Sequence, residues 1–343
     1  MSFDKSIFVI NHFPTGFALA RYSNMIIAAI NDSGTLMNIR FNPNFQKFPP
    51  GLLYEGTNSI LLNVTARRFV YMDAVAKLKE AIEEGGVIHY TDQSMPPLTR
   101  GGYNEVVTFH DLFALHENKG IDGIIYKRFV SHFLRFRNAI AISDTTRADL
   151  EEHKFEGAVA VIYHGVDPIF HPRNNKMELR KKYGLSIDKN IIISVSSDAP
   201  RKNLKLLREV SERLEDNFEI LRVGPPVGSR YNFSNVSDDT LAELYSASDA
   251  FILTSTDEGF NFPVVEAMAS GIPVVVSDIP IMREIVGDAG ILADVNSSES
   301  FIEGLKDAIG NWERFSGYSL RRSEKFSMNL FSQNMKSYYD GLL

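Results

Sequence analysis

Short, continuously apolar runs alternate with helical patterns from one end of the chain to the other. Val106 to His110 and Ala139 to Ser143 are such runs in the first half, and Asn190 to Ser196 and Ala250 to Ser255 are such runs in the second half. A strand without polar alternation is buried on both faces, as in a parallel sheet that is covered by helices. The pattern therefore predicts an α/β protein that is built on parallel sheets.

The length of 343 residues suits two domains. Between the halves, His164 to Pro172 contains one glycine and two prolines, which interrupt regular structure. We place the boundary there, with a Rossmann-like domain over residues 1–165, a second over residues 166–315 and a helical tail over residues 316–343. The spacing of apolar residues in the tail leaves open whether it returns to the first domain or packs on the second.

The composition excludes several classes of protein. The chain has no cysteine, so disulfides, thiolate metal sites and cysteine nucleophiles are ruled out. The formal charge of -7 argues against a dedicated nucleic-acid-binding protein. No apolar run approaches the ~20 residues of a membrane-spanning helix, and the first residues lack the pattern of a signal peptide. We therefore expect a cytoplasmic protein, and its oligomeric state is left open.

The stretch from Thr254 to Pro273 contains the strongest signal for a binding site. A strand ends near Ser255, and Pro263 stands where a helix should begin, since its missing N–H costs nothing there. A helix start of this kind can bind an anion such as a phosphate. The backbone amides expected to be free for it are those of Asn261, Phe262, Val264 and Val265.

Two glutamates, Glu258 and Glu266, flank this helix start. A carboxylate beside a bound anion would repel it unless the carboxylate binds hydroxyl groups, so the pair suits a ligand that has both phosphates and sugars. The alternative is that Glu266 only complements the helix dipole and that Glu258 is a solvated loop residue.

Two cations, Arg201 and Lys202, follow the strand that ends at Ser196. They could neutralise a diphosphate without a metal ion, although an exposed helix start is the alternative. In the first half, His110 lies at the carboxyl end of a strand, where a histidine could bind a sugar hydroxyl or serve only the core. Gly16, after the first strand, would allow the backbone to approach a ligand closely.

The order of these segments resembles the retaining glycosyltransferases of family GT4, which have the GT-B fold of two facing Rossmann-like domains. The resemblance covers nearly the whole chain, and its most specific part is the glutamate pair. The other matching segments include Thr108-Phe-His-Asp-Leu112, His164-Gly-Val-Asp167, Pro200-Arg-Lys-Asn-Leu204 and Ala267-Met-Ala-Ser-Gly-Ile-Pro-Val274.

The resemblance implies transfer of a sugar from a nucleotide-sugar donor to an acceptor hydroxyl, with the anomeric configuration retained. It implies that Glu266 binds the ribose, that Arg201 and Lys202 bind the diphosphate, and that His110 contacts the transferred sugar. The sugar is expected to be held by Glu258 and by the amides of Gly259, Phe260, Asn261 and Phe262. No metal or resident cofactor is implied, since the nucleotide sugar is a substrate.

Three positions depart from the family pattern. Asn261 stands where the family commonly has a glycine, Ser196 and Ser197 stand where many relatives have a glycine, and His164 replaces an asparagine. Asn261 could meet the donor sugar or change the donor preference.

The donor and the acceptor are less constrained by the sequence. The segments look most like mannosyltransferase-type members, which favours GDP-mannose, with UDP-sugars as alternatives. The acceptor could be a glycan, a lipid-linked sugar or a small molecule. The basic and aromatic stretch from Tyr126 to Arg137 could touch an anionic membrane, and a core helix is the favoured interpretation of it.

Two other functions fit the same architecture. One is a nucleotide-sugar 2-epimerase, and the other is a non-catalytic nucleotide-sugar-binding module. The glutamate spacing together with Arg201 and Lys202 favours the transferase.

Overall fold

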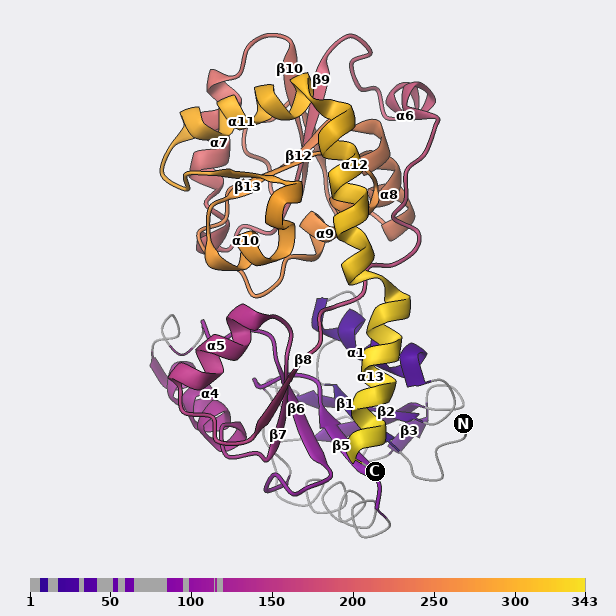
Figure 1. Cartoon of the computed structure of the whole chain (residues 1–343), viewed down its shortest axis with the longest axis vertical. Coiled ribbons are helices and arrows are strands. Elements are labelled where there is room, and N and C mark those ends of the chain that lie inside the picture. The colour runs from indigo at the N-terminus through magenta and orange to yellow at the C-terminus, as the bar shows by residue number, and fades with distance from the viewer. Residues whose placement is uncertain are drawn as a thin grey trace. The chain divides into compact units, whose positions relative to one another are not determined.

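The computed structural model describes residues 7–11, 18–30, 34–41, 52–54, 59–64, 85–94, 99–113, 115 and 120–342. Its contacts divide the chain into two compact units. Unit 1 consists of residues 1–164 and 329–343, and unit 2 consists of residues 165–328. Each unit is an α/β structure with its own sheet, which confirms the predicted fold class (Figure 1).

Unit 1 has an eight-stranded sheet in the order β3-β4-β2-β1-β5-β6-β7-β8. Every strand pair is parallel except β3 with β4. The strands are β1 (Ile7–Asn11), β2 (Gly34–Phe41), β3 (Leu52–Tyr54), β4 (Ser59–Val64), β5 (Val87–Tyr90), β6 (Glu105–Phe109), β7 (Asn138–Ala141) and β8 (Ala158–Val161). The helices are α1 (Ala18–Ile30), α4 (Gly120–Phe133), α5 (Asp144–Glu152) and the C-terminal α13 (Met328–Leu342).

The helix α13 joins the N-terminal part of the chain in unit 1. The hydroxyl of Tyr339, which is fully buried, hydrogen-bonds Nδ1 of His89 on β5. The ring of Phe331 packs edge-on against Tyr22 of α1, with 6.1 Å between the ring centres. The predicted tail is therefore divided, since residues 316–328 belong to unit 2 and residues 329–343 to unit 1.

Unit 2 has a six-stranded, all-parallel sheet in the order β11-β10-β9-β12-β13-β14. Its strands are β9 (Asn190–Val195), β10 (Phe218–Val223), β11 (Tyr231–Phe233), β12 (Ala250–Leu253), β13 (Val274–Ser277) and β14 (Ile291–Ala293). Its α-helices are α6 (Lys176–Lys182), α7 (Leu204–Arg213), α8 (Asp238–Ala247), α9 (Phe262–Ala269), α10 (Pro280–Val286), α11 (Ser298–Gly310) and α12 (Trp312–Ser323). Short 3-10 turns cover Pro200–Lys202, Gly287–Ala289 and Glu324–Phe326.

The central strands of unit 2 form the core that the sequence pattern predicts. Ile192 of β9, Ile252 of β12 and Val275 of β13 are fully buried, and they belong to one apolar cluster with α7 and α11. Because all strands of this sheet run in parallel, their carboxyl ends lie at one edge. Loops that follow β9 and β12 therefore meet at that edge, where ligands bind in sheets of this type.

Candidate donor site in unit 2 and His110 in unit 1

An ion cluster forms at the carboxyl edge of the unit 2 sheet. Nη1 of Arg201 lies 2.8 Å from Oε2 of Glu258, and Nζ of Lys202 lies 2.5 Å from Oε1 of the same carboxylate. The loops are tied together by the backbone, since the N–H of Thr256 donates to the carbonyl of Arg201 over 2.7 Å. The structure thus brings together three residues that the sequence analysis proposed separately.

Burial and neighbouring charge oppose each other in this cluster. Burial alone would raise the pKa of the Glu258 carboxyl, but the charges of Lys202 and Arg201 outweigh it and hold the pKa below its usual value. The pKa of the Lys202 ammonium is lowered, chiefly by burial and in part by the nearby charges of Arg201 and Arg222. One carboxylate is shared by two cations, so the three side chains together carry a net positive charge at the carboxyl edge of the sheet.

The helix α9 begins differently from the prediction. Asn261 has a φ of +77°, and its side-chain oxygen accepts from the N–H of Val264 over 3.2 Å. The amide of Val264 is therefore used by the helix cap, and the prediction that it is free for an anion is wrong. A positive φ favours glycine, and asparagine is among the few other residues that tolerate it.

Glu266 lies in the interior of α9 and is 2% exposed. The hydroxyl of Tyr245 on α8 donates to Oε2 of Glu266 over 3.2 Å. This contact fixes the carboxylate orientation, and the sequence analysis did not single out Tyr245. Gly259 precedes a buried Phe260, whose ring packs against Phe262 with 5.6 Å between the ring centres.

His110 directly follows β6 in unit 1 and is 7% exposed. Its Nε2 lies 2.7 Å from the carbonyl oxygen of Thr91, and because a carbonyl only accepts, Nε2 carries the hydrogen. Burial lowers the pKa of His110 to about 4, so the ring is neutral at pH 7 and its Nδ1 has an acceptor lone pair. The ring stacks on His164, with 5.3 Å between the ring centres.

Gly16 lies outside the described residues. His110 belongs to unit 1, whereas Arg201, Lys202, Glu258 and Glu266 belong to unit 2. Each group is therefore described within its own unit.

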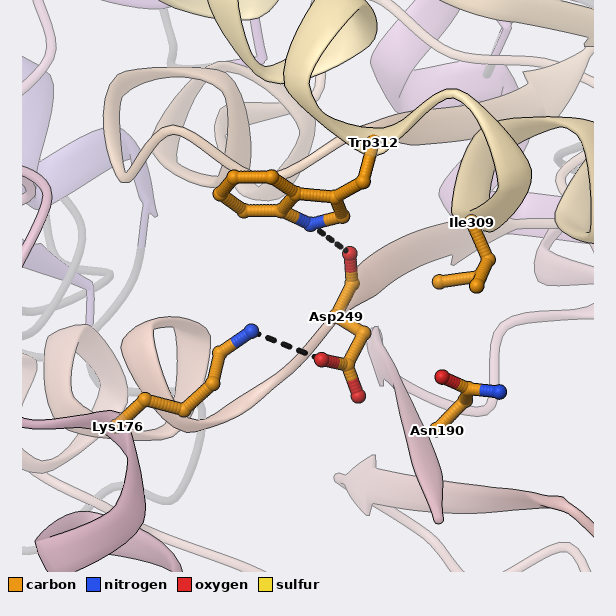
Figure 2. Close-up of a pocket in the computed structure, with 5 residues that line it drawn as sticks. All are labelled: Lys176, Asn190, Asp249, Ile309 and Trp312. Carbon is orange, nitrogen blue, oxygen red and sulfur yellow. Dashed lines mark hydrogen bonds and ion pairs between the residues drawn. The ribbon is translucent and has the colours of Figure 1, made fainter. Parts of the chain in front are cut away.

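A pocket of about 270 Å³ lies near the start of the unit 2 strands, away from the cluster of Arg201, Lys202 and Glu258. Figure 2 shows Lys176 and Trp312 both pointing to Asp249, the residue before β12. Nζ of Lys176 lies 2.8 Å from the carboxylate, and Nε1 of Trp312 donates to the backbone carbonyl over 2.9 Å. The remaining lining residues are Asn190 and Ile309. These contacts join α6, α12 and the strands, so we assign the pocket a structural role.

Comparison with known proteins agrees with the fold and the enzyme class. Residues 231–321 match the family model "Glycosyl transferases group 1". The O-antigen chain mannosyltransferase RfbU of Salmonella typhimurium is 25% identical over 251 residues, which cover 66% of this chain and 66% of RfbU. Matches to the first curated relatives thus span about two thirds of their length or less.

Solved structures match nearly the whole chain. A glycosyltransferase from Rickettsia africae has a TM-score of 0.76 at 19% identity, with 99% of each chain covered. HepE from Anabaena, solved in complex with UDP-glucose, has a TM-score of 0.74 at 15% identity and covers 98% of this chain and 99% of its own. Two α/β units of this kind define the GT-B class of fold. Within that class, residues 231–321 match the group 1 glycosyltransferases, and the chain is similar to GT4-like members of that class.

Proposed function

We propose that this protein is a retaining glycosyltransferase that moves a hexose from a nucleotide sugar to an acceptor hydroxyl. The observation that carries the proposal is the cluster of Arg201, Lys202 and Glu258 at the carboxyl edge of the unit 2 sheet. Glu266 lies in the helix that begins just after this cluster. Cations beside acceptor carboxylates suit a ligand that combines a diphosphate with sugars.

The chemistry follows from the charges of these groups. Arg201 and Lys202 stabilise the negative charge that develops on the departing diphosphate, so a divalent ion is not required. Glu258 and Glu266 accept hydrogen bonds from sugar and ribose hydroxyls. The bond from the anomeric carbon to the phosphate oxygen breaks, the bond to the acceptor oxygen forms on the same face, and the released phosphate oxygen takes the acceptor proton. His110, as a neutral ring, offers Nδ1 as an acceptor to a hydroxyl of the transferred sugar.

We favour mannose as the transferred sugar and GDP-mannose as the donor. The name of RfbU as a mannosyltransferase supports this choice. The complex of HepE with UDP-glucose keeps UDP-sugars as the alternative.

The proposed acceptor is a glycan, a lipid-linked sugar or a small molecule, and the proposed location is the cytoplasm, with peripheral contact at the inner membrane face in the lipid-linked case. Two aromatic residues of α4, Tyr126 and Phe133, are buried in the core, whereas Lys127 and Arg128 are exposed. A membrane contact would therefore be electrostatic and would depend on anionic lipids. Within the described residues, no helix is long and apolar enough to cross a membrane.

Sedimentation with vesicles tests this contact. The protein should pellet with phosphatidylglycerol-containing vesicles and not with phosphatidylcholine vesicles, and Lys127→Glu with Arg128→Glu should abolish the difference. Equal sedimentation of wild type with both vesicles would contradict the membrane proposal.

The transferase itself is tested by incubating the protein with GDP-mannose or UDP-glucose and following nucleotide release, with water as the acceptor of the sugar in the absence of the natural acceptor and with a panel of sugar acceptors in parallel. We expect release with one donor, and a loss of it in Glu258→Gln. Conversion of the donor to an isomer without release would instead identify an epimerase, and binding without either reaction would identify a non-catalytic module.

A further inference from the structure

Arg222 is the largest side chain that is fully buried in the described part of the chain, with 0% exposure. It is the last residue but one of β10, in the otherwise apolar run Ile220-Leu-Arg-Val223. Its strand neighbour in the register is Ser194 of β9, so it lies near the carboxyl edge of the sheet. Burying a cation costs several kcal/mol unless its surroundings compensate the charge.

All five N–H groups of the Arg222 guanidinium donate to neutral oxygens. Nε donates to the carbonyl of Pro225 over 3.1 Å, and Nη1 donates to the carbonyls of Ser194 and Val223 over 3.1 and 3.0 Å. Nη2 donates to the carbonyl and the hydroxyl of Ser196 over 2.6 and 2.9 Å. The hydrogen bonds are complete, and no carboxylate is among the acceptors.

A second buried arginine of unit 2 shows what the usual compensation is. Arg180, which is 4% exposed, pairs with the carboxylate of Asp249 and also donates to backbone carbonyls. Both arginines are buried and both donate to backbone carbonyls. Only Arg180 also bonds a carboxylate. Among the described residues, the guanidinium of Arg222 is thus held by neutral oxygens and by no carboxylate.

The loop that Arg222 holds leads to the proposed diphosphate site. Ser196 and Ser197 follow β9 and precede Arg201 and Lys202. The loop packs tightly on the residues that follow β10, since a Cβ at Gly224 would lie 2.1 Å from the carbonyl oxygen of Ser196. The charge of Arg222 also reaches Lys202 and contributes to the lowered pKa of its ammonium.

We infer that Arg222 is a positioning residue for the donor diphosphate, which it attracts through its uncompensated charge while it fixes the loop of Ser196 and Ser197. The inference rests on the proposed function and adds a third cation to Arg201 and Lys202. Because Arg222 is fully buried, it acts through the electric field and the loop rather than by contact. The bound diphosphate supplies the negative charge that the hydrogen-bond acceptors of Arg222 in the described residues do not supply.

The protein is titrated calorimetrically with GDP and UDP and, separately, with guanosine and uridine. Comparing the two kinds of ligand separates an effect of the Arg222 charge on the diphosphate from a general loss of structure. Arg222→Met should weaken binding of the matching diphosphate about tenfold or more and leave the nucleoside within about twofold. Arg222→Lys, which keeps the charge, should retain most of the preference for the diphosphate. Arg180→Met is the matched control and should leave the ratio of the two affinities unchanged.

Other outcomes would contradict the inference or the function on which it rests. Equal weakening of diphosphate and nucleoside, or the same loss in Arg180→Met, would overturn the role of Arg222. If Arg222→Met does not fold, the guanidinium resonance of Arg222 in labelled wild type is followed instead. It should move on addition of the diphosphate and not on addition of the nucleoside, and an unmoved resonance would also overturn the role. Failure of wild type to bind either diphosphate would contradict the proposed function itself.

Discussion

The two ends of the unit 2 sheet hold buried charge in different ways. At the amino end, Arg180 and Lys176 both bond the carboxylate of Asp249. Lys176 and Asp249 line the pocket there (Figure 2). At the carboxyl end, Arg222 bonds only neutral oxygens, and Glu258 is shared by two cations. Each end thus shares one carboxylate between two cations, and the carboxyl end has in addition the buried Arg222, whose acceptors are neutral, so that end is better suited to an added anion.

The largest predicted effect is on activity, where substitutions at the carboxyl end and at the amino end of the unit 2 sheet should differ. Lys202→Ala should lower kcat/KM for sugar transfer about 1,000-fold, because a cation that stabilises the leaving diphosphate is lost. Lys176→Ala, at the amino end, should leave kcat/KM nearly unchanged. Steady-state kinetics with the preferred donor gives both values, and equal losses in the two variants would break the comparison.

Substitutions at the amino end of the unit 2 sheet should instead change the free energy of unfolding. Asp249→Asn leaves the buried Arg180 without its carboxylate and should lower the free energy of unfolding by about 3 kcal/mol. Urea denaturation measures the change. The exposed pair of Asp278 and Arg283 provides the control, since Asp278→Asn should alter stability little. A negligible loss in Asp249→Asn would show that this cluster is not structural.

Unit 1 differs from unit 2 in its response to acid, because it buries neutral histidines. Burial lowers the pKa of His89 to about 3 and that of His110 to about 4, against 6.5 in the unfolded chain. The unfolded state therefore binds more protons between pH 6.5 and these values, and stability falls as the pH is lowered through this range. At pH 5 each histidine should contribute a loss of about 2 kcal/mol.

Urea denaturation of wild type and His89→Gln at pH 7 and pH 5 tests this sign. The variant should lose less stability on acidification than wild type. His171→Gln, at an exposed histidine, should behave as wild type. Equal pH dependence in all three proteins would contradict the assignment of a neutral, buried His89.

The smallest effect concerns the start of α9 at the carboxyl end. Asn261→Ala removes the helix cap and places a residue that disfavours positive φ, at a cost of about 1.5 kcal/mol of stability. Asn261→Gly, which restores the residue of the family, should cost only about a few tenths of a kcal/mol. Thermal unfolding compares the two, and equal losses would show that backbone conformation does not select the residue here.

The central strands and the ion cluster could be predicted from the sequence because they depend on local patterns. Continuous apolar runs marked the core strands, and the order of Arg201, Lys202, Glu258 and Glu266 marked one edge of a sheet. The three-residue strands β3, β11 and β14 lie at sheet edges and were not predicted, because so short a segment has little pattern. The partners of Arg222 come from separate loops, and the cap by Asn261 depends on its φ, so neither could be read from spacing.

The most direct test of the donor site is the thermal shift that nucleoside diphosphates produce in wild type, Lys202→Ala and Lys176→Ala. At 100 times its dissociation constant, GDP or UDP should stabilise wild type by about 2.7 kcal/mol. We predict that Lys176→Ala keeps the thermal shift produced by the diphosphate and that Lys202→Ala loses most of it. No shift in wild type with either diphosphate, or a shift that Lys202→Ala retains and Lys176→Ala loses, would contradict a donor site at the carboxyl edge of the unit 2 sheet.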